Sequence, residues 1–247
     1  MAHTFAVIIA AAGKSTRFRD QHYKKPFAPL ANKPVWLHSA ERFINRADVK
    51  QVILVISPAD AEVFAAKFAG NAAILGIEIV HGGQERADSI EKALARVRPD
   101  IGYVAVHDAA RPCLADAWIT QVFDAAAQSG AAILAIPVRG TLKKADNQGK
   151  IIDTIPRDNL WEAQTPQVFR RDWLLAAYAQ RNGFNATDDA QLLERSGKSV
   201  TLVSGSAINL KITTREDLKL AEHALQALPR PKLGNAMNPF ADDDMWR

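Results

Sequence analysis

One short stretch of the sequence combines small residues and cations in a way that suits phosphate binding. AAAGKSTRF, residues 10–18, follows the apolar run FAVII and contains one glycine, one lysine and an arginine. Small residues let a backbone approach a ligand closely, and N–H groups at a helix start can bind phosphate oxygens. The stretch is not a Walker loop, since Ile8 lies five positions before Gly13, and Ser15 replaces the second glycine of a dinucleotide fingerprint. It therefore predicts a phosphate contact of another kind.

Three further charged segments follow apolar runs. They are HGGQERADS at 81–89, HDAARP at 107–112, and NLKITT at 209–214, which holds Lys211. Cations in such turns can neutralise charge on a phosphoryl group during transfer. Together with the first stretch they predict a nucleotide site, although Arg86 could instead pair with Glu85 or Asp88 on a helix surface.

The elements that must position these turns alternate between strands and helices. The nearly continuous apolar runs at 5–9, 51–57, 74–80, 103–107 and 131–137 are typical of strands buried on both faces. Helical patterns occupy 34–45, 58–69, 86–97 and 115–128, and further helices are expected at 170–181 and 187–197. This order predicts an α/β fold with a mostly parallel sheet, and the carboxyl ends of parallel strands, where ligands bind, meet at one edge.

Two segments depart from that order. Residues 140–155 predict an exposed polar hairpin within an arm of about residues 138–160, and such an arm is either a surface excursion or a contact with another subunit. The residues from 229 to 247 are rich in Pro, Asn and Asp and predict a mobile tail. Residues 1–228 are expected to form a single domain.

Composition bounds the partners and the compartment. The net charge of +4 fits a small anionic substrate, and the absence of a run of five basic residues gives no support to a nucleic-acid partner. Cys113 is the only cysteine, so neither a disulfide framework nor a cysteine metal site is expected. No signal peptide or membrane span is recognised near the first residues. We expect a cytoplasmic protein.

Seven stretches in consistent order, from about residue 5 to residue 225, resemble the motifs of the 2-C-methyl-D-erythritol 4-phosphate cytidylyltransferase family. They are AAAGKSTRF, KKPF, HGGQERADS, VHDAARP, PVRGTLKKA, IPRDNLWEAQTPQVF and NLKITTREDL. The resemblance implies a Rossmann-like three-layer α/β/α sandwich with a protruding hairpin. It also implies attack of the methylerythritol 4-phosphate on the α-phosphorus of CTP, with release of pyrophosphate and with Mg²⁺ held mainly by the CTP phosphates rather than by a metal site of the protein.

The resemblance further implies roles for individual residues. Arg17 and Lys25 would stabilise the α-phosphate, and Arg157 and Lys211 would hold the attacking phosphate; these four are the expected catalytic residues. CTP would contact Ala11, Ala12, Gly13, Gly83, Arg86, Ser89, Asp108 and Ala109, with cytosine read by backbone groups and Ser89, and with Asp108 touching the ribose side or the hydrated metal. The alcohol substrate would contact Arg111, Thr141, Thr165 and Thr187.

The family arm crosses to a second subunit, so the resemblance implies a homodimer in which Thr141 and Arg157 act in trans. Three departures from the family pattern bear on the site. Ser15 would be strained at positive φ, and a different loop path is expected there. Lys24 competes with Lys25 for the catalytic position, and Gln84 occupies a position that is often acidic.

Two alternative functions remain open at this point. The first is cytidylyl transfer to another polyol phosphate, such as ribitol 5-phosphate, because those enzymes share most of the motifs. The second is a non-catalytic nucleotide-binding paralogue, against which the complete set of expected cations argues.

Overall fold

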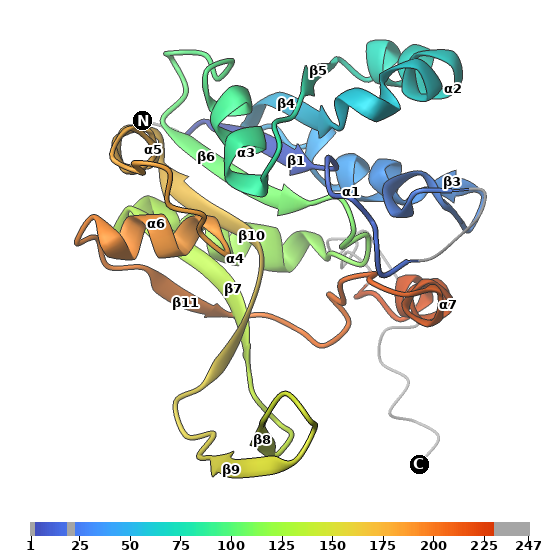
Figure 1. Ribbon diagram of the computed structural model, residues 1–247. Coiled ribbons are helices and arrows are strands. Elements are labelled where there is room, and N and C mark those ends of the chain that lie inside the picture. The colour runs from blue at the N-terminus through green and yellow to red at the C-terminus, as the bar shows by residue number, and fades with distance from the viewer. Residues whose placement is uncertain (1–2, 19–22, 230–247) are drawn as a thin grey trace, which may run out of the picture.

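Seven strands form one twisted sheet at the centre of the fold (Figure 1). The computed structural model describes residues 3–18 and 23–229. The strand order is β11-β7-β10-β6-β1-β4-β5, and every neighbouring pair is parallel except those made by β10. The predicted α/β fold with a mostly parallel sheet is confirmed.

The strands are β1 (Phe5–Ala10), β2 (Pro29–Leu30), β3 (Lys33–Pro34), β4 (Val49–Ile56), β5 (Ile77–His81), β6 (Tyr103–Asp108), β7 (Ala131–Pro137), β8 (Leu142–Ala145), β9 (Ile151–Ile155), β10 (Trp161–Arg170) and β11 (Thr201–Ser204). The helices are α1 (Val35–Ile44), α2 (Ala61–Ile74), α3 (Arg86–Leu94), α4 (Asp116–Ser129), α5 (Arg171–Ala179), α6 (Asp189–Arg195) and α7 (Arg215–Gln226). Two short 3₁₀ turns, η1 (Lys25–Phe27) and η2 (Pro58–Asp60), precede β2 and α2.

Successive side chains of β1 enter two different cores, which is why its sequence is apolar without interruption. Phe5, Val7 and Ile9 pack with α1, α2 and α4 on one face, whereas Ala6 and Ile8 pack with α3, α5 and α6 on the other. All five are at most 3% exposed. Alternation across a strand and helices on both faces therefore produce the three layers.

A third, smaller core attaches α7 to the site edge of the sheet. Ala221 of α7 and Ile212 pack against Phe18, which ends the first turn, and against Cys113. Burial raises the pKa of the Cys113 thiol to about 12, so this cysteine is an apolar filler rather than a reactive group.

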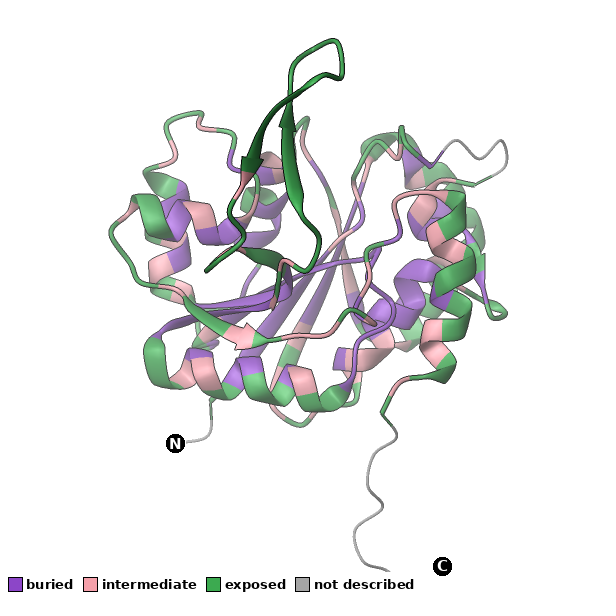
Figure 2. Cartoon of the chain, turned by 90° about the horizontal axis from the view of Figure 1, so that it is seen from below, coloured by how far each residue is buried: buried purple, intermediate pink, exposed green. Residues whose placement is uncertain are grey.

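The hairpin arm is present as expected: β8 and β9 pair antiparallel with each other and with no other described strand. It extends away from the sheet and its residues are almost all exposed (Figure 2). Ile151 and Ile152 are 65% and 60% exposed, an unusual position for isoleucine. None of the core clusters of the described residues includes a side chain of the arm.

Two observed strands differ from the sequence-based expectation. β5 begins at Ile77 and not at residue 74, because α2 runs to Ile74 and Gly76, at φ +65°, turns the chain after it. β10 was not expected as a strand, because WEAQTPQVFR is polar over its first half and contains a proline. From residue 230 onward the predicted tail lies outside the described residues, and among the described residues no helix is long and apolar enough to cross a membrane.

Candidate active site

The expected turns meet because the strands before them end in register. Ala10 of β1 pairs with Asp108 of β6, and β4 ends beside β5 with Ile56 opposite His81. The chain runs outward from β1 to β4 and β5 and then returns to β6 on the other side of β1. This reversal leaves a crevice at the carboxyl ends of the strands, where ligands bind in open α/β sheets.

Glycine at two positions allows the turns after β1 and β5 to come together. A Cβ on Gly82 would lie 2.6 Å from Ser89 Oγ and 2.8 Å from the Ala12 Cβ, and one on Gly83 would lie 2.4 Å from the Asp88 Cβ. The Ser89 hydroxyl donates to the Glu85 carbonyl and accepts the Gly83 N–H, each at 3.0 Å. Ser89 therefore holds the glycine turn in shape.

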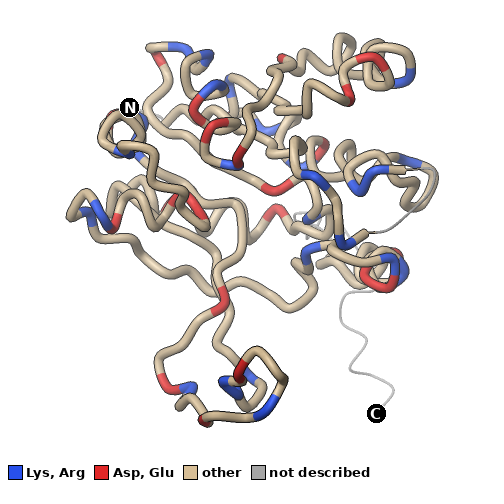
Figure 3. The backbone as a smooth tube through the Cα atoms, viewed as in Figure 1, with Lys and Arg blue, Asp and Glu red and all other residues tan. Residues whose placement is uncertain are grey.

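A cavity of about 300 Å³ opens at this edge. It is lined by Ala10, Ala11, Ala12, Gly13, Lys14, Lys25, Pro26, Gly83, Gln84, Glu85, Arg86, Ser89, Asp108, Ala110 and Lys211. Four cations and two carboxylates are in this set, so the lining is net positive, and Figure 3 shows Lys and Arg gathered where the loop after β1 approaches α7. An anionic ligand of nucleotide size suits the cavity.

The first turn contains a left-handed residue where a different loop path was expected. Ser15 has φ +52°, and its hydroxyl lies 3.4 Å from the Gly13 carbonyl. The loop therefore keeps the conformation that favours glycine although the residue is serine, and the expectation of another path is wrong. A Cβ on Gly13 would meet nothing within 4 Å, so the space beside Gly13 is open to the cavity.

Lys25 and not Lys24 lies at the cavity. Lys24 Nζ is 2.5 Å from Asp60 Oδ1, and neither residue is among those that line the cavity. Burial lowers the pKa of the Lys25 ammonium, and the nearby positive charges of Lys211 and Arg17 lower it further against the opposing Asp108. An anion bound among these three cations would relieve their mutual repulsion. Arg17 itself is exposed and is not among the lining residues.

Asp108 lies between two cations at the end of β6. Its Oδ2 is 2.6 Å from Lys211 Nζ and 3.8 Å from Arg111 Nε. Burial by itself raises the pKa of the Asp108 carboxyl, but the charges of Lys211, Arg86 and Arg111 outweigh burial and hold that pKa well below its usual range. Asp108 is therefore ionised, and its charge orients Lys211 in the cavity wall.

Arg86 is anchored by a residue far along the chain and not by its helix neighbours. Its Nη2 donates to Oδ2 of the fully buried Asp189 at 2.7 Å, and the Tyr178 hydroxyl donates to the other oxygen of that carboxylate at 2.6 Å. The surface pair with Glu85 or Asp88 that the sequence also allowed is not formed. Asp88 instead pairs with Arg181 at 2.7 Å.

Several residues expected to touch ligands are not in the cavity lining. Ala109 is fully buried, its N–H donates to the Ala10 carbonyl, and its carbonyl accepts the Ser39 hydroxyl. Arg111 is 6% exposed and donates to the carbonyls of Asn209 and Ala163. These residues connect loops of the site rather than border its open space.

Thr165, Thr187, Thr141 and Arg157 also lie outside the lining. Thr165 is 5% exposed, and its hydroxyl forms hydrogen bonds with the Asp108 N–H and with His107 Nδ1. Thr187 is exposed and donates its N–H to Gln191 Oε1 at 2.9 Å. Thr141 and Arg157 are exposed on the arm, where the Arg157 guanidinium donates to the Arg139 carbonyl.

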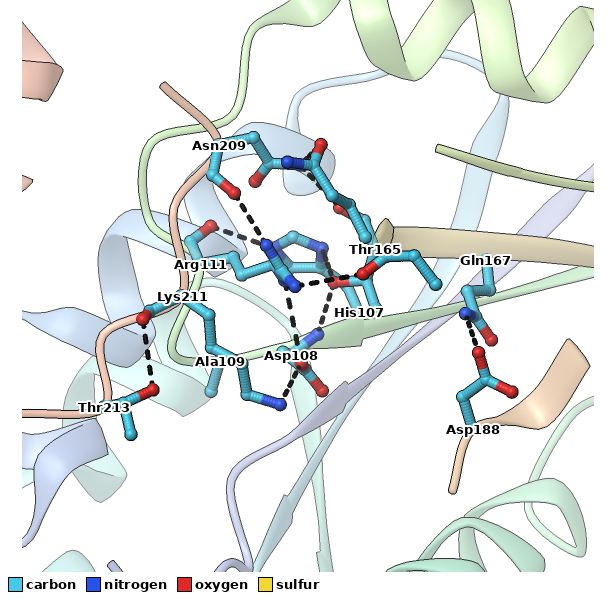
Figure 4. A network of polar contacts seen from close by, with 12 residues as sticks. His107, Asp108, Ala109, Arg111, Thr165, Gln167, Asp188, Asn209, Lys211 and Thr213 are labelled. Atoms are coloured by element: carbon cyan, nitrogen blue, oxygen red, sulfur yellow. Dashed lines mark hydrogen bonds and ion pairs between the residues drawn. The ribbon is translucent and has the colours of Figure 1, made fainter. Parts of the chain in front are cut away.

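Four residues that sequence reasoning did not select support the site. Asp189 and Tyr178 hold Arg86, while His107 and Asn209 both contact Thr165 near Asp108 and Lys211 (Figure 4). Asp189, two residues after Thr187, and His107, next to Asp108, are visible in the sequence, but nothing local indicates their partners.

The fold and the site together define an α/β nucleotidyltransferase: glycine- and alanine-lined turns and converging cations lie at the carboxyl edge of a mostly parallel sheet. The sequence model of the family described as 2-C-methyl-D-erythritol 4-phosphate cytidylyltransferase matches residues 5–227, and the chain belongs to that family. It is accordingly a cytidylyltransferase of isoprenoid precursor biosynthesis.

Relatives and solved structures agree with this assignment. The enzyme of that name from Rhodopirellula baltica is 43% identical over 235 residues, which cover 91% of this chain and 96% of the relative. The Pelotomaculum thermopropionicum enzyme is 40% identical, with 90% and 94% covered. The crystal structure of the Thermus thermophilus enzyme is 32% identical with a TM-score of 0.75, covering 89% of this chain and 98% of that one. The crystal structure of the Francisella tularensis enzyme is 29% identical with a TM-score of 0.77, covering 90% of this chain and 100% of that one.

Proposed function

We propose that this cavity joins CTP to 2-C-methyl-D-erythritol 4-phosphate through the residues expected from the sequence. The observation that carries the proposal is the meeting of Lys25, Lys211 and Arg86 around Asp108 at the edge where Gly13 and Gly83 leave room for a triphosphate. In the reaction, an oxygen of the 4-phosphate forms a bond to the α-phosphorus while the bond from that phosphorus to the bridging oxygen breaks. The electron pair leaves with pyrophosphate.

The protein contributes position and charge to this step. Arg17 and Lys25 face the α-phosphate, where negative charge increases in the transition state, and Lys211 faces the attacking phosphate. Asp108 keeps Lys211 extended into the site through its 2.6 Å contact. Two anions that repel each other in water are thereby held within reach.

The cytosine base is expected on the side of the glycine turn formed by Gly83 and Ser89. The Ser89 hydroxyl donates to Glu85 and accepts from Gly83, so one acceptor lone pair remains for a base amino group. Backbone groups of this turn supply the rest of the recognition.

The donor set fits a magnesium ion held mainly by CTP. Among the described residues no three His, Cys, Asp or Glu side chains cluster, and the carboxylates that line the cavity are Asp108 and Glu85. One of these two carboxylates together with phosphate oxygens suits Mg²⁺, which usually takes few protein ligands. When bound, Mg²⁺ neutralises phosphate charge; the side chains above orient the phosphates.

The arm is proposed to complete the site of a second copy in a homodimer. Thr141 and Arg157 carry suitable groups for the polyol phosphate, yet in this chain they are exposed and outside the cavity lining. The exposed Ile151 and Ile152 support a protein contact, because exposed apolar surface of this kind marks interaction sites. A cytoplasmic location is inferred from the single, buried cysteine.

A substrate panel tests the proposal. Purified protein with CTP and Mg²⁺ is given methylerythritol 4-phosphate or ribitol 5-phosphate, and pyrophosphate release is measured. Faster turnover of methylerythritol phosphate supports the proposal, and the family match favours that outcome. A preference for ribitol phosphate would establish the alternative enzyme, and no release from pH 6 to 9 would support a non-catalytic binder.

A further inference from the structure

The backbone of Asp108 is held by a side chain where the β6–β10 ladder ends. The last paired residues of that ladder are Gln167 and Val106, two residues before Asp108. Beyond that point the Asp108 N–H donates to Thr165 Oγ1 at 3.0 Å. A threonine hydroxyl thus takes the place of a main-chain acceptor at the site edge of the sheet.

The same hydroxyl contacts His107, and the partners determine the direction of each hydrogen bond. His107 Nε2 lies 3.1 Å from the Arg111 carbonyl, which can only accept, so Nε2 carries the proton. The Thr165 hydroxyl already accepts from Asp108, and its own proton points to His107 Nδ1 at 3.0 Å. The bonds therefore run in one sense from the Asp108 N–H through Thr165 and His107 to the Arg111 carbonyl.

This chain of bonds is closed to water. His107, Thr165 and Asp108 are 0%, 5% and 7% exposed, so an unmade hydrogen bond among them would not be replaced by solvent. A protonated His107 would donate through both nitrogens and leave the Thr165 proton without an acceptor. The arrangement is satisfied only by the neutral imidazole with its proton on Nε2.

The network also holds the loop that carries Lys211. Asn209 Nδ2 donates to the Thr165 carbonyl at 2.9 Å, and the Arg111 guanidinium donates to the Asn209 carbonyl at 2.7 Å (Figure 4). Thr165 is therefore fastened to Asp108 by its hydroxyl and to the Lys211 loop by its carbonyl.

We propose that His107 is a positioning residue for cytidylyl transfer, which acts by orienting the Thr165 hydroxyl and thereby the main chain of Asp108. Asp108 in turn sets Lys211 Nζ at 2.6 Å from its carboxylate, and a small displacement of that ammonium weakens a contact made to the reacting phosphate. The inference rests on the proposed role of Lys211. It assigns Thr165 a role in the support of Asp108.

A matched pair of variants tests the hydroxyl. Thr165→Val keeps the shape but leaves the buried Asp108 N–H and His107 Nδ1 unpartnered, and Thr165→Ser keeps the hydroxyl. We expect Thr165→Val to lower kcat about 5- to 100-fold with KM for CTP changed less than kcat, and Thr165→Ser to stay within about threefold of the parent. Equal kcat for the two variants would overturn the proposal.

His107→Phe keeps an aromatic ring against Phe43, whose ring centre lies 5.3 Å away, and removes both nitrogens. Because His107 and Thr165 act in one chain, we expect the double variant His107→Phe/Thr165→Val to lose no more than about threefold beyond the worse single variant. Independent, multiplicative losses would contradict the relay.

Nitrogen-15 spectra of the parent protein provide a test that needs neither activity nor a folded His107 variant. We expect a protonated Nε2 and an acceptor Nδ1 for His107, and we expect Thr165→Val to move the Nδ1 resonance toward that of an unbonded imine nitrogen. A proton on Nδ1, or no response to Thr165→Val, would overturn the inference. A parent protein with this spectrum but without cytidylyl transfer would instead refute the proposed function.

Discussion

Removing the charge of Lys24 should lower the stability of the protein, whereas removing the charge of the adjacent Lys25 should lower its catalytic rate. Lys25 lines the cavity, where burial and the charges of Lys211 and Arg17 lower its pKa. Lys24 pairs with Asp60, whose side chain is 7% exposed, and Asp60 Oδ2 has no hydrogen-bond partner. Substituting each lysine by methionine removes the charge while keeping much of the apolar stem.

The magnitudes follow from these surroundings. Loss of one preorganised cation from a transition state costs about 10²–10³ in kcat, so Lys25→Met should lose that much with little change in stability. Lys24→Met leaves a buried carboxylate without its cation. A fully buried broken pair costs about 3–5 kcal/mol, but Lys24 is 41% exposed, so we expect about 1–2 kcal/mol and a fall in Tm of about 2–8 °C.

The assay combines pyrophosphate release at saturating CTP with thermal unfolding of both variants and the parent. We expect Lys24→Met to keep kcat within about threefold at a temperature well below its Tm. The double variant Lys24→Met/Asp60→Asn should recover part of the lost stability, because it removes the unpaired carboxylate. A 100-fold loss of kcat in Lys24→Met with an unchanged Tm would refute the assignment of Lys25.

Three other predictions concern the turn, the charge and the arm. Gly83→Ala places a Cβ 2.4 Å from the Asp88 Cβ in the first turn of α3 and should raise KM for CTP about 5- to 100-fold. The control Gly70→Ala adds a Cβ that meets nothing within 4 Å and should leave this KM unchanged. Equal KM values for the two variants would contradict the close packing at Gly83. Because the pKa of Lys25 is lowered, its ammonium loses its proton at a pH below the ordinary lysine value of 10.5, and kcat/KM should fall as the pH rises through that range. Lys25→Arg should move this fall to higher pH, and an unchanged pH profile would exclude Lys25 as the group that causes it. Mixing Arg157→Ala subunits with Lys211→Ala subunits should restore about a quarter to a half of the activity per mixed dimer if the arm acts in trans, and no recovery in verified mixed dimers would contradict it.

Local pattern was sufficient for the layers and for the edge that carries the site. The run FAVIIA is typical of a strand buried on both faces, and parallel strands bring their carboxyl ends to one edge. The turns holding Gly13, Gly83 and Asp108 could therefore be expected together before any distance was known.

Other features could not be read locally, because they depend on partners far along the chain. β10 is a strand only because β6 and β7 lie on either side of it; its own residues, polar and with Pro166, do not form an apolar run. Asp189 binds Arg86 across 103 positions, and His107 meets Thr165 across 58. No spacing rule relates such pairs.

By itself the sequence determined which residue types were available at the sheet edge: four cations, one carboxylate at the end of β6, and glycines where backbones approach. The tertiary structure alone decided which of them face the cavity. Lys24 and Lys25 are neighbours of the same type, and the direction of the η1 turn sends one to Asp60 and the other toward Lys211. Thr165 likewise has a hydroxyl that could bind many partners, and the fold places it between His107 and Asp108. The physical reason is that side-chain type sets what a residue can bind, whereas backbone direction and burial set what it meets.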